Sequence, residues 1–468
     1  MSKLKRVFTH KSKLFLILVG MILALSCESP LGDEGTGGGS DGGSGGGGSG
    51  GGGTITNKDG KVFPAWYLTE QQQQQNFSMG PTILFDTKRN DGNPNLEANQ
   101  HYRIPAVIVA TNGNIIAIAD NRYSHGGDIG TGNNKPIDIV YKISKDGGNT
   151  WSEEKIIPPK TPNNSTMTGI DSKGDVLVFK ALDGTLVCMA VSGGGYSAAS
   201  SANTPSRMVR SESKNNGETW SSWQEVGQEL FEEIKNKHGK KRGFATSGRG
   251  LTLKDGTFAA GLSVDGSGKN QGITFVYAYS KDKGMTWTYG GFIPGSADTS
   301  ITINEPKPIA ELENGKILTS SRNAKNPLVN QGENPRLYAV FDSNGGNMPT
   351  KFSKWDFRCG NVDAEGVVWT RQTTHDKNRM LHIQAGPNGR NGLKLFLSED
   401  EGQTWLEKKL LLPDSVGACY ASIDVAGDGT VITLAEEFSK NGKYYDIVFR
   451  RYNMKAITGE VYQTSWYK

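Results

Sequence analysis

Short apolar runs joined by turn sequences follow one another along most of the chain. In the first clear example, Ala106–Ala110 and Ile115–Ala119 flank the dipeptide Asn112-Gly113. An Asn-Gly or Asp-Gly dipeptide between apolar runs is a strong signal for a β-hairpin. The pattern therefore predicts an all-β chain of hairpin-connected sheets. It recurs around Asp183-Gly184, Asp255-Gly256, Asn314-Gly315 and Asp428-Gly429.

Helical periodicity is almost absent from the sequence. Only Leu230–Lys237 predicts a short helix, and the glutamine run Gln71–Gln75 is expected to form a loop. We expect ordered structure to begin near Gly80 and to continue to Lys468.

The pattern S-x-(D/N)-x-G-x-T-W occurs four times, and we call each copy a box. Its Asp or Asn side chain can close a turn onto N–H groups two residues on, its Gly supplies a positive φ, and its Trp ring should be buried. The first three boxes start 69 and 67 residues apart, and the fourth starts 118 residues after the third. Recurrence on this scale predicts repeated sheets, as in a β-propeller. The boxes are Ser144–Trp151, Ser213–Trp220, Ser280–Trp287 and Ser398–Trp405.

The chain has 468 residues and a formal net charge of +4, but the basic excess lies at its start. Residues 1–26 carry five Lys or Arg residues and no acid, so their removal leaves a charge of −1. A nearly neutral chain without a basic run has no nucleic-acid footprint. We expect no nucleic-acid partner.

The N-terminus is typical of an exported protein. A basic segment precedes the 12-residue apolar run Leu14–Leu25, which suits a signal peptide over residues 1–26. Cys27 follows directly, as in bacterial lipoprotein signals, so we expect lipidation at Cys27 and a membrane anchor at the cell surface or in the periplasm. The alternative is an ordinary secretory signal with a coincidental cysteine. Residues 27–79 are expected to form a tether, since 14 of the 19 residues in Gly35–Gly53 are glycine.

The other cysteines, Cys188, Cys359 and Cys419, form no CxxC pair and no zinc pattern. We interpret Cys188 and Cys359 as small buried side chains. The six histidines show no metal-ligand spacing. We therefore expect neither a metal nor an organic cofactor.

The segment Tyr102-Arg103-Ile104-Pro105, together with the boxes, resembles the bacterial exo-acting sialidases (neuraminidases) over residues 80–468. The resemblance implies one six-bladed β-propeller that removes terminal sialic acid from glycoproteins, glycolipids or oligosaccharides with retention. It also implies three arginines that grip the carboxylate of the substrate, here Arg103, Arg322 and Arg390. A guanidinium group suits this task because its planar fork binds a carboxylate bidentately.

In this family the nucleophile is a tyrosine activated by a glutamate, which the resemblance assigns to Tyr420 and Glu305. A neutral phenol avoids the repulsion that a carboxylate nucleophile would meet from the anionic substrate, but it needs a base to activate it. The alternative for Tyr420 is a packed residue at a strand end.

The resemblance assigns the general acid/base to Asp128, on a loop made pliable by Gly126, Gly127 and Gly130. Arg122 is expected to contact the substrate, and Asp120 to be structural. His125 is tempting as a base, but the family has no histidine there, and a lone loop histidine is usually solvated.

One more aspartate, Asp175, is expected near the acetamide of the sugar, with Asp171 as its competitor. The pocket for the N-acetyl group, the linkage preference and the oligomeric state beyond an expected monomer stay open. Three other functions are also open: an intramolecular or intermolecular trans-sialidase with the same site, a non-catalytic glycan-binding propeller, and a scaffold in which the boxes serve only the fold.

Overall fold

A computed structural model describes most of the chain from residue 53 onward. The predicted signal peptide, Cys27, Gly35–Gly52 and Cys359 lie outside the described residues. The described ranges are 53–57, 59–87, 100–123, 125–131, 136–196, 204–240, 242–265, 273–295, 301–324, 334–358, 360–386, 389–438 and 444–463.

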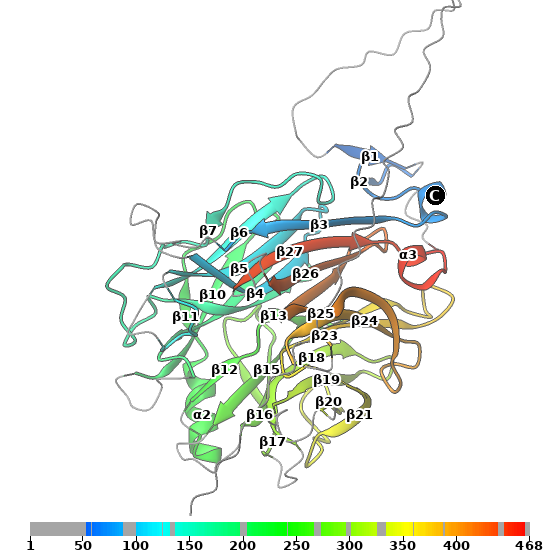
Figure 1. Ribbon diagram of the computed structural model, residues 1–468. Coiled ribbons are helices and arrows are strands. Elements are labelled where there is room, and N and C mark those ends of the chain that lie inside the picture. The colour runs from blue at the N-terminus through cyan, green and yellow to red at the C-terminus, as the bar shows by residue number, and fades with distance from the viewer. Residues whose placement is uncertain are drawn as a thin grey trace, which may run out of the picture. The chain divides into compact units, whose positions relative to one another are not determined.

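Antiparallel strands make up nearly all of the regular structure (Figure 1). The first large sheet contains β4 (Gln100–Val109), β5 (Ile115–Tyr123), β6 (Ile137–Ser144) and β7 (Lys155–Ile156). The second contains β8 (Gly174–Lys180), β9 (Leu186–Gly193), β10 (Ser206–Ser213) and β11 (Gln224–Val226), with β13 (Gly248–Arg249) parallel to β8.

The remaining large sheets follow in chain order. The third contains β12 (Arg242–Ala245), β14 (Leu251–Thr252), β15 (Phe258–Asp265), β16 (Thr274–Ser280) and β17 (Thr288–Ile293). The fourth contains β18 (Ile303–Glu311), β19 (Lys316–Asn323), β20 (Pro335–Asp342) and β21 (Ser353–Arg358). The last has seven strands: β22 (Glu365–Thr370), β23 (Arg379–Ala385), β24 (Asn391–Ser398), β25 (Leu406–Val425), β26 (Val431–Phe438), β27 (Tyr445–Tyr452) and β3 (Ser78–Phe85).

The innermost strands of these sheets form a closed ring. In chain order, β4 contacts β8, β8 contacts β14, β14 contacts β18, β18 contacts β22, β22 contacts β25, and β25 returns to β4. Sheets arranged radially around such a ring form a β-propeller, as the repeats predict. The N-terminal strand β3 completes the last sheet by pairing with β27 near the C-terminus.

The expectation of six separate sheets differs from the hydrogen bonding. Four sheets have the four or five strands typical of a propeller blade, whereas the fifth has seven. The physical reason is the 20-residue strand β25, whose first part pairs with β24 and whose last part pairs with β26. The continuous strand joins two ladders into one sheet.

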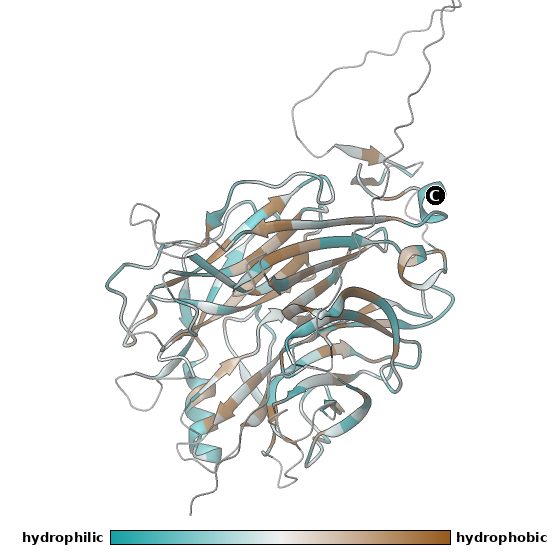
Figure 2. Cartoon of the chain, in the orientation of Figure 1, coloured by the Kyte–Doolittle hydropathy of each residue, from teal (hydrophilic) through white to brown (hydrophobic). Residues whose placement is uncertain are grey.

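All five predicted hairpins are confirmed, and the predicted helix Leu230–Lys237 lies within α2 (Gln228–His238). Apolar residues gather in the strands, whereas α2 and many loops are more hydrophilic (Figure 2). Among the described residues, no helix has the length and apolar character needed to cross a membrane.

Residues 54–79, expected within the tether, contain β1 (Thr54–Thr56), β2 (Val62–Pro64) and α1 (Glu70–Gln73) as well as the start of β3. Part of the glutamine run is thus helical rather than loop. The buried Gln73 side chain donates to the Asp428 carbonyl at 2.8 Å, and the Leu68 N–H donates to the Asp428 carboxylate at 2.9 Å. Contacts across about 360 residues fix this segment on the propeller. A further short helix, α3 (Met454–Thr458), follows β27.

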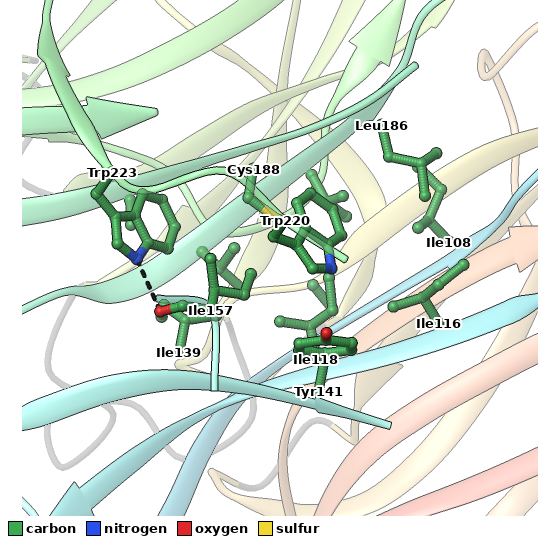
Figure 3. Close-up of a cluster of buried hydrophobic side chains, with 14 of the residues drawn as sticks. Ile108, Ile116, Ile118, Ile139, Tyr141, Ile157, Leu186, Cys188, Trp220 and Trp223 are labelled. Carbon is green, nitrogen blue, oxygen red and sulfur yellow. Dashed lines mark hydrogen bonds between the residues drawn. The ribbon is translucent and has the colours of Figure 1, made fainter. Parts of the chain in front are cut away.

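Apolar side chains fill the space between neighbouring sheets. Figure 3 shows such a cluster, in which isoleucines from β5 and β6 pack against Cys188 and the ring of Trp220 from the second box. Trp223 donates its indole N–H to the Ile157 carbonyl at 3.2 Å. Cys188 is fully buried with a free thiol, which confirms the sequence interpretation of this cysteine.

The boxes form compact turns, but their hydrogen bonds reach further than expected. In the first box, the Asp146 carboxylate accepts from the N–H of Thr150, four residues on, at 2.9 Å, and from its hydroxyl at 2.6 Å. The Ser144 hydroxyl accepts from the Gly148 N–H at 2.8 Å. Trp220, Trp287 and Trp405 are buried, as predicted, whereas Trp151 of the first box is only half-buried.

Candidate active site

Four of the candidate site residues lie on one edge of the ring, near the start of β4, β8 and β18 and of the part of β25 that pairs with β26. At each of these positions the pairing register with the neighbouring strand shifts. Such a shift marks a β-bulge or a similar irregularity, and bulges redirect side chains beside active sites. The shifts occur at Arg103/Ala106, Gly174/Leu177, Asn304/Lys307 and Ala418/Ala421. They bring Arg103, Asp175, Glu305 and Tyr420 to this edge.

Three residues at these irregularities have a positive φ although none is glycine. The φ values are 56° for Ile104, 56° for Asp175 and 46° for Glu305. This conformation is unfavourable, above all for a β-branched side chain, so surrounding contacts must hold it. The Glu305 N–H donates to the Ser263 hydroxyl at 3.0 Å, and the Ile104 N–H donates to the Glu436 carboxylate at 2.7 Å.

Tyr420, Glu305 and Arg322 meet in one hydrogen-bonded group. The Tyr420 hydroxyl donates to Oε1 of Glu305, and Nη1 of Arg322 donates to Oε2 of Glu305 at 2.8 Å. Nη1 of Arg322 also lies 3.4 Å from the Tyr420 hydroxyl. The carboxylate therefore stands where a base must stand to take the phenolic proton.

The surroundings of Tyr420 favour its protonated form. Burial, together with the negative charge of Glu305, raises the pKa of Tyr420 well above its ordinary value, although Arg322 opposes this. A raised pKa favours the protonated phenol, which agrees with the Tyr420 hydroxyl as the donor in its hydrogen bond to Glu305.

Arg103 is held by a residue that the sequence reasoning missed. Its Nε donates at 2.7 Å to Glu436 in β26, a fully buried carboxylate, so Glu436 fixes both Arg103 and the Ile104 backbone. Burial raises the pKa of Glu436, but Arg103 and these hydrogen bonds lower it below its ordinary value. The sequence could have pointed to Glu436, because two adjacent acids, Glu436-Glu437, stand at the end of an apolar strand and a buried charge needs a partner.

Arg322 is held in the same manner by a second residue missed from the sequence, since its Nε donates to the Asn361 side chain at 2.7 Å. Both arginines are thus anchored through Nε. Among the contacts formed by the described residues, the terminal nitrogens of Arg103 and Nη2 of Arg322 have no hydrogen bond to another side chain. These nitrogens can bind an anion.

Arg390, the third predicted arginine, is exposed and hydrogen-bonds Tyr445. The Arg103 guanidinium carbon lies 5.1 Å from the Tyr445 ring centroid and 5.7 Å from that of Tyr420. Tyr445 thus contacts both arginines. It was also missed from the sequence, because its strand is far along the chain from Arg103.

Arg122 lies in a second group, rich in carboxylates. It donates to Oδ2 of Asp120 through Nε at 3.2 Å and Nη2 at 2.8 Å, to Asp128 at 2.7 Å, and approaches Asp175 at 3.5 Å. Asp120 is completely buried and also accepts from the Asp175 N–H at 3.0 Å. This agrees with the structural role expected for Asp120.

One guanidinium group serves three carboxylates, and the pKa values of these carboxylates diverge. Burial, with the charges of Asp120 and Asp128, raises the pKa of Asp175 well above its ordinary value. Burial raises the pKa of Asp120 to about 6, although Arg122 lowers it. Burial also raises the pKa of Asp128, but Arg122 outweighs it, and the result lies below the ordinary value.

Asp128 lies on the loop after β5, with its side chain 63% exposed. The next residue, Ile129, is buried, so the loop has an apolar anchor beside a solvent-facing carboxylate. His125 is half-buried rather than solvated, and its Nδ1 accepts from the Gly127 N–H at 3.2 Å. Of the two competing aspartates, Asp175 lies at Arg122, whereas Asp171 accepts from the Thr166 N–H at 2.9 Å.

Comparison with known proteins places this geometry in context. The family model described as a BNR repeat-like domain matches residues 130–433. A sialidase of Paraclostridium sordellii is 27% identical over 325 residues, which cover 66% of this chain and 72% of that protein.

Two solved structures share the fold at low identity. The NanB sialidase of Streptococcus pneumoniae has a TM-score of 0.61 and 16% identity, with coverage of 81% of this chain and 71% of that one. The intramolecular trans-sialidase of Ruminococcus gnavus has a TM-score of 0.57 and 15% identity, with coverage of 82% and 99%. These likenesses support the all-β propeller.

Proposed function

The chain belongs to the BNR repeat-like domain family, and on this premise we propose that it is an exo-α-sialidase that removes terminal sialic acids from glycoconjugates. The observation that carries the proposal is the contact of Tyr420 with Glu305 and Arg322. A buried tyrosine hydrogen-bonded to a glutamate can supply a nucleophile and the base that activates it. The sialidases among its relatives support the choice of substrate.

The arginines around Tyr420 suit the carboxylate next to the anomeric carbon of sialic acid. Arg103 and Arg322 are anchored through Nε and present terminal nitrogens, and Arg390 stands beside Tyr445. A carboxylate bound by such a cluster would bring the adjacent anomeric carbon close to the Tyr420 hydroxyl. Fixed charges of this kind need no reorganisation during the reaction.

The proposed reaction has two steps and retains the anomeric configuration. First, the Tyr420 oxygen bonds to the anomeric carbon, its proton passes to Glu305, the glycosidic C–O bond breaks, and Asp128 protonates the leaving oxygen. Then Asp128 takes a proton from water, the water oxygen bonds to the anomeric carbon, the bond to Tyr420 breaks, and Glu305 returns the proton to the phenol.

The ion pair between Asp128 and Arg122 opposes the acid step in the unliganded protein, because it favours the ionised carboxylate. We propose that bound substrate brings a second negative charge near this group and raises the pKa of Asp128. Asp175, with its raised pKa, would then remain protonated beside Arg122 and donate a hydrogen bond to the sugar.

Several finer features are proposals of the same kind. We propose six blades, counting the two ladders joined by β25 as two blades, because the ring of innermost strands supports this count. An axial cavity of about 570 Å³ is lined by the far ends of those strands. Export through the signal peptide, anchoring at Cys27 and a monomeric state are proposed from the sequence alone.

The test is cleavage of a fluorogenic aryl α-sialoside by the purified protein and by Tyr420→Phe, with products identified by mass and NMR. We expect free sialic acid, released first as the α-anomer, and a loss of about 10³-fold or more in the variant. A product one water lighter would indicate an intramolecular trans-sialidase. A folded protein without turnover on several linkages would instead indicate a glycan-binding propeller.

A further inference from the structure

A cavity of about 470 Å³ lies outside the ring, between the second sheet and α2. Its apolar lining includes Met208, Val226, Phe231 and Ile234. Met208 and Val226 face each other across β10 and β11, and Leu230 and Ile234 of α2 pack into the same apolar cluster. Figure 1 shows α2 near β12 and away from the ring of innermost strands. The cavity contains none of the candidate catalytic residues.

Part of the cavity wall lies at the same end of the second sheet as Asp175. In the second sheet, Gly174 pairs with Val191 and Ser206 pairs with Gly193, so Ser206 and Asp175 mark the same edge. Neighbouring strands lie about 4.8 Å apart, which puts Ser206 roughly 10–12 Å from Gly174 across β9. Ser206 lines the cavity.

A shared segment connects the cavity wall with the loop of the proposed acid. The Ser206 hydroxyl donates to the Gly195 carbonyl at 2.5 Å, and Gly195 packs so tightly on Ile129 that a Cβ there would lie 2.7 Å from the Ile129 carbonyl oxygen. Ile129 directly follows Asp128. These contacts link the cavity wall to the loop of Asp128, the residue proposed to protonate the leaving oxygen.

The rim of the cavity is charged and predominantly basic. Arg207 pairs with Glu225, and Lys235 pairs with Glu232 at 3.0 Å. Two further basic residues, Lys240 and Arg242, line the same cavity, so basic side chains outnumber acidic ones by four to two. The Arg242 guanidinium also stacks 4.7 Å from the Tyr196 ring centroid.

We propose that this cavity binds an acidic sugar in the part of the glycan beyond the scissile bond. The inference rests on the proposed sialidase function and adds a substrate class to it. An apolar floor suits the face of a sugar ring, and a basic rim suits a carboxylate or a sulfate ester. The best substrates would carry a second sialic acid or a sulfated sugar next to the terminal sialic acid.

Two lysines of α2 supply a matched pair for the test. Lys235 and Lys237 are 53% and 51% exposed, and each is paired with a glutamate of the same helix. Lys235 lines the cavity, whereas Lys237 does not. The double variant Lys235→Gln/Lys240→Gln removes two charges from the rim, whereas Lys237→Gln removes one charge elsewhere on the helix.

The kcat/KM of each protein would be measured on an aryl sialoside, sialyllactose, α2,8-linked disialyllactose and a sulfated sialyllactose. We expect wild type to prefer the acidic substrates and the double variant to lose about tenfold on them. Its rates on the aryl sialoside and sialyllactose should be unchanged, as should every rate of Lys237→Gln. A preference for only one acidic substrate would identify carboxylate or sulfate as the group bound.

The outcomes separate this inference from the function beneath it. Lack of cleavage of the aryl sialoside by wild type would contradict the proposed sialidase function. Normal cleavage of the aryl sialoside, with no preference for acidic substrates or with equal losses in Lys237→Gln, would overturn only the acidic-sugar site.

Discussion

Replacing Asp128 by alanine tests the proposed acid most directly, because its effect should depend on the leaving group. General acid catalysis contributes about 10²–10⁴-fold, which corresponds to about 2.7–5.4 kcal/mol of barrier. A sugar leaves as a strongly basic alkoxide unless it is protonated, whereas an aryl group leaves as a weakly basic phenolate. We therefore expect a loss in this range on sialyllactose and less than about tenfold on an activated aryl sialoside.

The structure predicts that Asp128→Ala leaves the fold intact. The Asp128 carboxylate is 63% exposed, and Arg122 keeps both contacts with Asp120, at 3.2 and 2.8 Å, after Asp128 is removed. Arg122 is buried, but it remains paired with Asp120 and lies 3.5 Å from Asp175, so the urea midpoint should change little. His125→Ala, on the same loop, is the matched control and should keep its activity within about threefold.

The pH dependence gives an independent check of the same residue. Burial raises the pKa of Asp128, but Arg122 holds it below its ordinary value in the free protein. Because a general acid must be protonated, kcat/KM on sialyllactose should fall as pH rises above that pKa, and Asp128→Ala should lack this fall. Equal losses on both substrates, or an unchanged pH profile in the variant, would refute the assignment.

Three further predictions concern other parts of the molecule. Arg103→Lys should lower kcat/KM by about 10–100-fold in steady-state assays. Arginine binds Glu436 through Nε and keeps two terminal nitrogens for a ligand, whereas lysine has a single nitrogen. Wild-type rates in the variant would contradict this prediction. Asp146→Ala should cost about 1–3 kcal/mol in urea unfolding and Asp146→Asn clearly less, since Asn215 makes the equivalent contacts in the second box; equal costs would count against the box account. Burial raises the pKa of Asp120 to about 6, so the contribution of Asp120 to the free energy of unfolding is present below pH 4 and is lost as pH rises through 6. Asp120→Asn should remove this part of the pH dependence of the urea midpoint. An unaltered pH dependence in the variant would argue against this account.

The strands were predictable because their signals are local. Each hairpin has its own turn dipeptide between apolar runs, and α2 has its own periodicity, so short windows of sequence were sufficient. The segment 54–79 was not predictable in this way. Its order depends on contacts such as Leu68 with Asp428, which lie about 360 residues apart and leave no mark on the local pattern.

The same difference between local and distant signals separates the site residues that were predicted from those that were missed. Arg103, Glu305 and Tyr420 were found because short motifs surround them, and the structure brings Glu305 and Tyr420 into contact. Glu436 and Asn361, which hold Arg103 and Arg322, were missed because each acts on a residue from another part of the chain. The turn predicted at the Asp of each box was misjudged by two residues, since Asp146 accepts from the N–H of Thr150, four residues on.

The distribution of charge differs between the two groups of the candidate site. Around Tyr420 the arginines are fixed by partners that use only part of their hydrogen-bonding capacity, so an incoming carboxylate finds donors already in place. Around Arg122 the balance is reversed, because three carboxylates share one guanidinium group. Three carboxylates that share one positive charge bind a proton readily, and any added negative charge would favour protonation of one of them. Binding of an anionic substrate by the first group would thus prepare the second group to donate a proton.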